Sequence, residues 1–182
     1  MLGLSGFGVL RAKEIPLIPA RADQDSIDEA QARDRARTFN AATPLALRVV
    51  APSEREQAIS TMGLTTEEQQ ALSSELGVAR SPAPRAAADE RPLRLAWITL
   101  WDTHAQDGDM VRVDSSGFST TVTLSNTPIT FAVPVPEQGV VNLTGIRDCG
   151  GGITIGAMSG GQRVALPVMS VGQVLGVPVV AR

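Results

Sequence analysis

The segment LRLAWITLWDTHAQDGDMVRV, residues Leu93–Val113, has the pattern of two β-strands joined by an acidic loop. Apolar side chains alternate along both of its ends, as they do in half-buried strands. Within the loop, Asp107-Gly108 suits the positive φ that a tight turn requires. The segment therefore predicts the start of a β-domain.

The rest of the chain after this segment continues the strand pattern, with Gly, Pro and Asn turn signals between short apolar runs. The further predicted strands are Phe118–Leu124, Ile129–Val135, Val140–Ile146, Ile153–Ala157 and Arg163–Val168. This spacing predicts a C-terminal antiparallel β-sandwich, Ig-like or jelly-roll-like, in a mainly β protein. Val174–Val180 is expected as an edge strand, because Pro178 cannot donate a hydrogen bond within a sheet.

The N-terminal half is charged and has helical signals instead. Capping patterns at Ser26, Ser53 and Thr65 predict three short helices, and Pro44–Val50 is expected to be extended. Residues 78–92 are rich in Ala, Pro, Arg and Ser, which is typical of a linker. We therefore predict an N-terminal helical and extended arm over residues 1–77, a linker over 78–92, and a sandwich over 93–182 that folds alone.

Composition excludes several classes of protein. The net charge of the 182 residues is −3, which gives no basic footprint for nucleic acid. The single cysteine, Cys149, excludes an internal disulfide, and no apolar run reaches the roughly 20 residues of a membrane span. The apolar run Met1–Leu10 is followed, rather than preceded, by basic residues, so no signal peptide is visible. It is expected to pack on something as an apolar arm.

The acidic loop carries the main candidate site. Asp102, Asp107 and Asp109, helped by Asp148 from a later loop, are the oxygen ligands that a hard cation such as calcium prefers. The spacing does not match the twelve-residue helical calcium loop, whose terminal Glu is missing here. A plain structural turn explains the same residues, and both interpretations stay open.

No catalytic site is predicted. His104 is the only histidine and is expected to be an exposed loop residue, while Cys149 is expected to be a buried or half-buried thiol. The run Gly150–Gly152 leads into the strand-like Ile153–Ile155 rather than a helix, which argues for a tight β-connection and against a phosphate site.

Trp97 and Trp101 share one face of their strand with Leu93 and Leu95. Two tryptophans spaced in this way are candidates for a sugar-stacking surface. We expect them instead to be core residues of the sandwich, since only six Trp and Phe residues occur in the whole chain.

The stretch from Leu95 to Gly156, with Trp101-Asp102, the Asp107-Gly108-Asp109 turn and the glycine-rich loop before Ile153, resembles small secreted β-sandwich modules of bacteria. Some β-sandwich carbohydrate-binding modules also use calcium. The resemblance covers about a third of the chain and implies a binding or assembly module rather than an enzyme.

Apolar patches in the arm, at Met1–Leu10, Ile15–Ile18 and Leu45–Val50, indicate contacts with other subunits. The expected function is therefore that of a non-enzymatic structural protein in a multi-copy assembly, a homo-oligomer or larger, anchored by its arm. A virion decoration, collar or fibre-base protein, or a bacterial surface subunit, would fit. The alternative is a secreted, calcium-stabilised module that recognises carbohydrate or another surface polymer.

Overall fold

The computed structural model describes residues 27–39, 43–78 and 93–182 of the chain. Several predictions fall outside these ranges. They concern the apolar stretches Met1–Leu10 and Ile15–Ile18, the cap at Ser26, and the linker except for its first residue.

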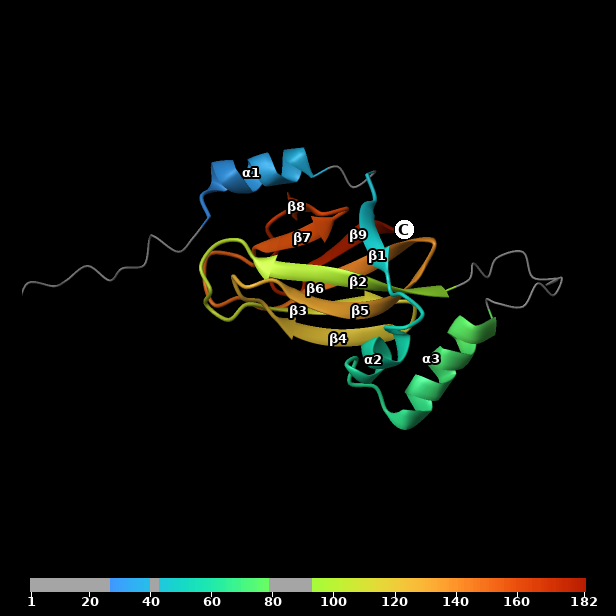
Figure 1. The fold of residues 1–182 in the computed structure, drawn as a ribbon. Coiled ribbons are helices and arrows are strands. Elements are labelled where there is room, and N and C mark those ends of the chain that lie inside the picture. The colour runs from blue at the N-terminus through green and yellow to red at the C-terminus, as the bar shows by residue number, and fades with distance from the viewer. Residues whose placement is uncertain (1–26, 40–42, 79–92) are drawn as a thin grey trace, which may run out of the picture.

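The predicted mainly β fold is confirmed, and a single core lies between the two parts of a folded sheet (Figure 1). The strands are β1 (Leu45–Val49), β2 (Leu93–Asp102), β3 (Met110–Ser115), β4 (Phe118–Thr123), β5 (Ile129–Pro136), β6 (Gln138–Arg147), β7 (Ile155–Ser159), β8 (Gln162–Ala165) and β9 (Val174–Ala181). Their order is β4-β3-β6-β9-β1-β2-β7-β8, with β5 paired to β2.

Strand β1 joins the two parts of the sheet. Its first residues pair in parallel with β9, from Leu45 opposite Val179, and its last residues pair antiparallel with β2, with Arg48 opposite Trp97. Leu45 and Leu47 are buried, since the apolar side of β1 faces the core. The extended segment predicted here is confirmed. It belongs to the sheet itself, so a sandwich that starts at residue 93 lacks one of its strands.

The expectation that the last strand lies at an edge is wrong, because β9 lies between β6 and β1. Ala181 donates to Glu137 beside β6, and Arg182 donates to Leu47 of β1. By alternation, an N–H at Pro178 would point toward β1. The β1 pairing begins only at Val179, so the missing donor of Pro178 leaves no strand partner unsatisfied.

The three helices are α1 (Glu29–Thr38), α2 (Arg55–Ser60) and α3 (Thr66–Val78). The predicted pair of Glu29 with Arg33 is present at 2.7 Å, and Asp28 caps α1. The capping pattern at Thr65 is confirmed, because Thr65 and Glu68 exchange backbone and side-chain hydrogen bonds. None of the helices in the described ranges is long and apolar enough to cross a bilayer.

The helices differ in how they meet the sheet (Figure 1). Ile59 of α2 and Leu72 and Leu76 of α3 belong to the same buried cluster as the strands. Helix α1 lies on the opposite side, near β7 and β8, and buries none of its own residues. Thus α2 and α3 extend the core, whereas α1 rests on the surface.

Strand β2 buries residues on both of its faces. Ala96, Ile98 and Leu100 lie on one face and are at most 2% exposed. Leu95 and the two tryptophans lie on the other face, where Trp97 lies opposite Arg48 and Trp101 opposite Gly156. Leu95 and Trp101 are buried, as expected, whereas Trp97 is only partly buried and packs against the core cluster.

Candidate functional site

The acidic loop lies at one end of the sheet, between β2 and β3. Its first aspartate, Asp102, ends β2 and donates its backbone N–H to Ser125 at 2.7 Å. Its last, Asp109, directly precedes β3 and accepts a backbone hydrogen bond from Leu124 at 2.8 Å. The chain that follows β4 therefore holds both ends of the loop in place.

This anchoring brings three of the four predicted ligands together. One carboxylate oxygen from each of Asp102, Asp107 and Asp109 lies within 4.8 Å of the other two. Asp102 and Asp109 are only 2% and 1% exposed, whereas Asp107 is more accessible to solvent. Buried carboxylates are costly unless protein groups or an ion compensate their charge.

The hydrogen bonds of Asp102 satisfy only one of its oxygens. Its Oδ1 accepts from the Thr154 hydroxyl at 2.5 Å and from the backbone N–H of His104 at 2.9 Å. Its Oδ2 is buried and has no hydrogen-bond partner among the described residues. Hydrogen bonds within the described part of the protein therefore compensate the burial of the Asp102 carboxylate only in part.

Asp109 shows the electrostatic consequence of this crowding. The pKa of its carboxyl is raised to about 6, chiefly by burial and also by the neighbouring charges of Asp107 and Asp148, while a backbone hydrogen bond from Cys149 acts in the lowering direction. That bond, from Cys149 N to Asp109 Oδ1, measures 3.0 Å. Asp107 in turn accepts the backbone N–H of Asp109 at 3.3 Å.

A cation from α1 approaches the same loop. The guanidinium of Arg35 donates to the Thr103 hydroxyl at 2.7 Å. Partial burial lowers the pKa of Arg35, and the negative charge of Asp102 acts in the opposite direction. No ion pair within 4.0 Å joins Arg35 to Asp102 in the described part of the chain. Arg35 thus offsets part of the loop's negative charge from a distance.

Asp148 has a separate role from the other three aspartates. Its Oδ1 accepts the backbone N–H groups of Gly150 and Gly152, at 2.8 and 3.3 Å. Both glycines have positive φ, as the predicted tight β-connection requires. Asp148 lies close enough to affect Asp109 but is not in the group of three converging oxygens.

The histidine and cysteine do not sit where the sequence predicted. Cys149 is exposed, so the expectation of a buried or half-buried thiol is wrong; it follows Asp148 in an outward loop rather than a strand. His104 is half-buried rather than exposed, and its Nε2 is enclosed without a hydrogen-bond partner in the described ranges. Among the described residues, neither side chain forms a hydrogen bond that would make a nucleophile–base pair.

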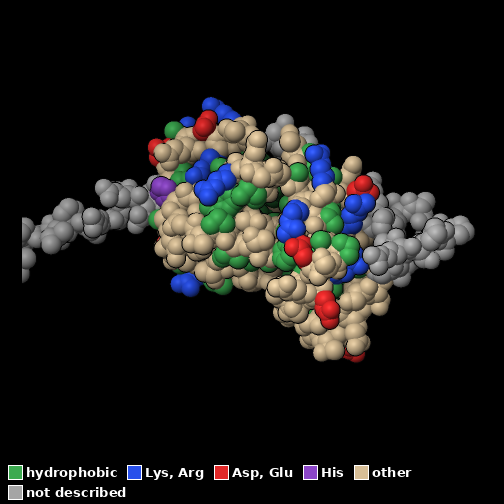
Figure 2. Space-filling model, viewed as in Figure 1, with side chains coloured by type: hydrophobic (Ala, Val, Ile, Leu, Met, Phe, Trp, Pro, Cys, Tyr) green, Lys and Arg blue, Asp and Glu red, His purple; other side chains and the backbone are tan. Residues whose placement is uncertain are grey.

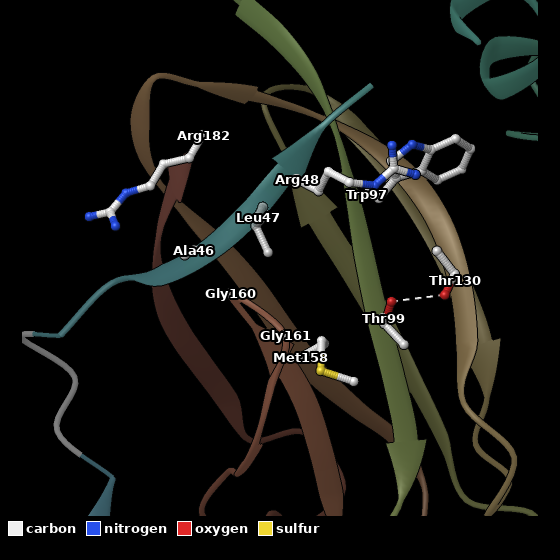
Figure 3. A pocket seen from close by; sticks show the side chains of 10 residues that line it. All are labelled: Ala46, Leu47, Arg48, Trp97, Thr99, Thr130, Met158, Gly160, Gly161 and Arg182. Carbon is white, nitrogen blue, oxygen red and sulfur yellow. Dashed lines mark hydrogen bonds between the residues drawn. The ribbon is translucent and has the colours of Figure 1, made fainter. Parts of the chain in front are cut away.

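A groove of about 610 Å³ opens on the outer face of the sheet, where β1 leaves β2 to join β9. Trp97, Thr99 and Met158 line it, with Arg48 on one side and Gly160-Gly161 of the β7–β8 turn on another (Figure 3). The Thr99 and Thr130 hydroxyls share a hydrogen bond of 2.8 Å along it. On the same face, basic side chains flank a hollow (Figure 2).

Arginines cover both tryptophans on this face. The Arg48 guanidinium lies 5.7 Å from the centre of the Trp97 ring, and Arg163 lies 5.2 Å from that of Trp101. Arg48 is held there by Glu54 at 3.0 Å, a contact that lowers the pKa of Glu54. Trp101 is 6% exposed, and its indole packs on Gly156. Trp97 is therefore the more accessible of the two.

Sequence reasoning identified the acidic loop but not the groove. The groove combines residues from β1, β2, β5, β7 and the C-terminal Arg182, and no local motif links them. The one available signal was the shared face of Trp97 and Trp101, which was interpreted as core.

Comparison with known proteins adds no assignment: no family model, curated protein or solved structure matches this chain.

Proposed function

We propose that the protein is a non-enzymatic structural module of a multi-copy assembly, anchored by its N-terminal arm. A virion decoration, collar or fibre-base position, or a bacterial cell-surface assembly, would suit such a module. The observation that carries the proposal is an apolar strip, which we define as Val140, Ile146, Val171 and Val174, all 39–59% exposed.

Val140 and Ile146 belong to β6, Val174 begins β9, and Val171 lies in the turn that precedes β9. Val140 pairs with Pro178 and Val174 with Thr144, so the alternation of the paired strands places Val140 and Val174 on the same face. Val141 and Leu143 face the core. Large exposed aliphatic side chains gathered on one sheet face are typical of contact surfaces. A subunit interface would remove this area from water.

The occupant that we propose is the apolar arm segment, residues 1–18, of a neighbouring copy. This segment contains Met1–Leu10 and Ile15–Ile18, whose side chains match the strip in chemistry. The 26 residues that precede Ile27 can span at most about 90 Å when extended, which is enough to reach an adjacent sandwich. Exchange of such arms would connect many copies.

The test is the oligomeric state of the full chain by light scattering coupled to size exclusion. The wild type should form oligomers, and Val140→Glu/Val174→Glu should be monomeric while keeping a cooperative melting transition. Thr121→Glu/Thr123→Glu is the matched control, because both threonines are exposed on β4, away from the strip. A monomeric wild type, or oligomers that persist in the strip variant, would contradict the proposal.

The second candidate is a secreted module that recognises carbohydrate or another surface polymer, favoured by the groove beside Trp97. A sugar that stacks on this indole must displace Arg48 from it. Tryptophan fluorescence, titrated with a panel of soluble polysaccharides, would detect this binding. A response in the wild type that is absent in Trp97→Phe/Arg48→Ala supports this function, and a flat titration with every polymer excludes it.

A further inference from the structure

We propose that Asp102, Asp107 and Asp109 bind one calcium ion at the β2–β3 end of the sandwich. The acidic cluster alone would not justify this inference. The second observation is the buried Oδ2 of Asp102, which lies on a carboxylate of the cluster and has no hydrogen-bond partner among the described residues. A bound cation supplies the partner that the protein does not.

The spread of the oxygens suits calcium. Calcium binds oxygens at about 2.4 Å, so two ligands on opposite sides of the ion lie about 4.8 Å apart. The three carboxylate oxygens fall within that limit. Magnesium also takes oxygen ligands, but it demands a near-ideal octahedron at about 2.0–2.1 Å and usually keeps several of its waters, so protein carboxylates alone hold it less often.

The chemistry of the donors points the same way. The group holds carboxylate oxygens alone, without the imidazole or thiolate ligands that favour zinc or copper. The remaining positions of a calcium ion can be filled by water and by backbone carbonyls, as the accessibility of Asp107 permits.

The positive charge of Arg35 does not take the place of the ion. Arg35 is bonded to Thr103 and forms no close ion pair with Asp102, so one distant positive charge faces three carboxylates.

The test is titration of the chelator-treated full chain with Tb³⁺, which takes calcium-type oxygen ligands and emits when a nearby tryptophan is excited. Trp101 directly precedes Asp102, so a bound ion should give sensitised emission that calcium removes by competition. Calcium alone should also raise the melting temperature, because it binds only the folded site.

Asp107→Asn keeps an oxygen to accept the Asp109 N–H and should weaken calcium binding by at least about ten-fold. Asp109→Asn should do the same, which guards against a folding defect in a single variant. Asp148→Asn is the matched control, since it removes a nearby charge outside the group of three, and it should bind within a few-fold of the wild type. Absence of terbium emission and of a calcium-induced thermal shift in the wild type overturns the proposal. An equal loss of calcium binding in Asp148→Asn also overturns it.

Discussion

At the residue scale, Gly156 shows how the outer face of β2 is packed. A Cβ at this position would overlap the indole of Trp101, which lies directly across the strand pair. Gly156 has an ordinary β conformation, so the requirement for glycine comes from the close approach of the ring and not from the backbone.

Gly156→Ala should therefore destabilise the protein by about 1–3 kcal/mol, because the buried indole and its Arg163 contact must shift. Urea unfolding would measure this loss. Gly176→Ala is the matched control: its Cβ would have its nearest contact at 3.4 Å, on the side chain of Val140, and should change stability little. Equal effects of the two substitutions would contradict the packing argument.

A second prediction at this scale concerns Asp109 and pH. Its folded-state pKa of about 6 lies above the ordinary value of 3.8, so the folded protein holds this proton more tightly than the unfolded chain. In calcium-free buffer, the contribution of Asp109 to stability is present below about pH 4 and is lost as the pH rises to about 6.

Asp109→Asn removes this pH dependence and keeps an oxygen that accepts the Cys149 N–H. Without calcium, the variant should gain on the order of 1 kcal/mol or more over the wild type at pH 7 and lose that advantage near pH 4. Urea unfolding of both proteins across this range gives the difference directly. A difference independent of pH would show that Asp109 has an ordinary pKa.

At the scale of elements, β1 determines whether the sheet is complete. It pairs with β9 on one side and with β2 on the other, and Leu47 is 2% exposed. Leu47→Ala should cost about 2–5 kcal/mol of stability, as expected for a buried leucine. Val174→Ala, at a side chain that is 59% exposed, should change stability by less than about 0.5 kcal/mol in calorimetry.

The position of β1 also changes an expectation about truncation. A fragment of residues 93–182 leaves β9 and part of β2 as open edges and removes Ile59, Leu72 and Leu76 from the core. We now expect this fragment to unfold or aggregate, whereas residues 43–182 should fold. Circular dichroism and amide exchange would compare the two. A cooperative, soluble fragment 93–182 would show that β1 is dispensable.

At the scale of the whole molecule, the assembly proposal assigns separate tasks to the arm and the sandwich. Deletion of residues 1–26 should convert the oligomer to a monomer and leave the melting temperature of the monomer unchanged, because the proposal places those residues on a neighbouring copy rather than on their own sandwich. Sedimentation velocity across a concentration series would measure this change. An oligomer that survives the deletion would mean that the strip pairs with something other than the arm.

The sequence by itself determined the local features of this protein. The alternation of apolar residues was sufficient to place most of the strands, and the capping pattern of Thr65 and Glu68 was sufficient to place the start of α3. Both signals depend only on residues that are close together in the chain. The convergence of Asp102, Asp107 and Asp109 was also predictable, since a loop of eight residues keeps them close together.

Only the tertiary structure decided which elements meet. The inward position of β9, the insertion of β1 and the outward face of Trp97 all depend on pairing between segments far apart in sequence. An apolar side chain is equally compatible with a core or with a covered outer face, so its pattern cannot tell the two apart. For the same reason the groove beside Trp97 arises only where β1 diverges from β2 in the folded sheet.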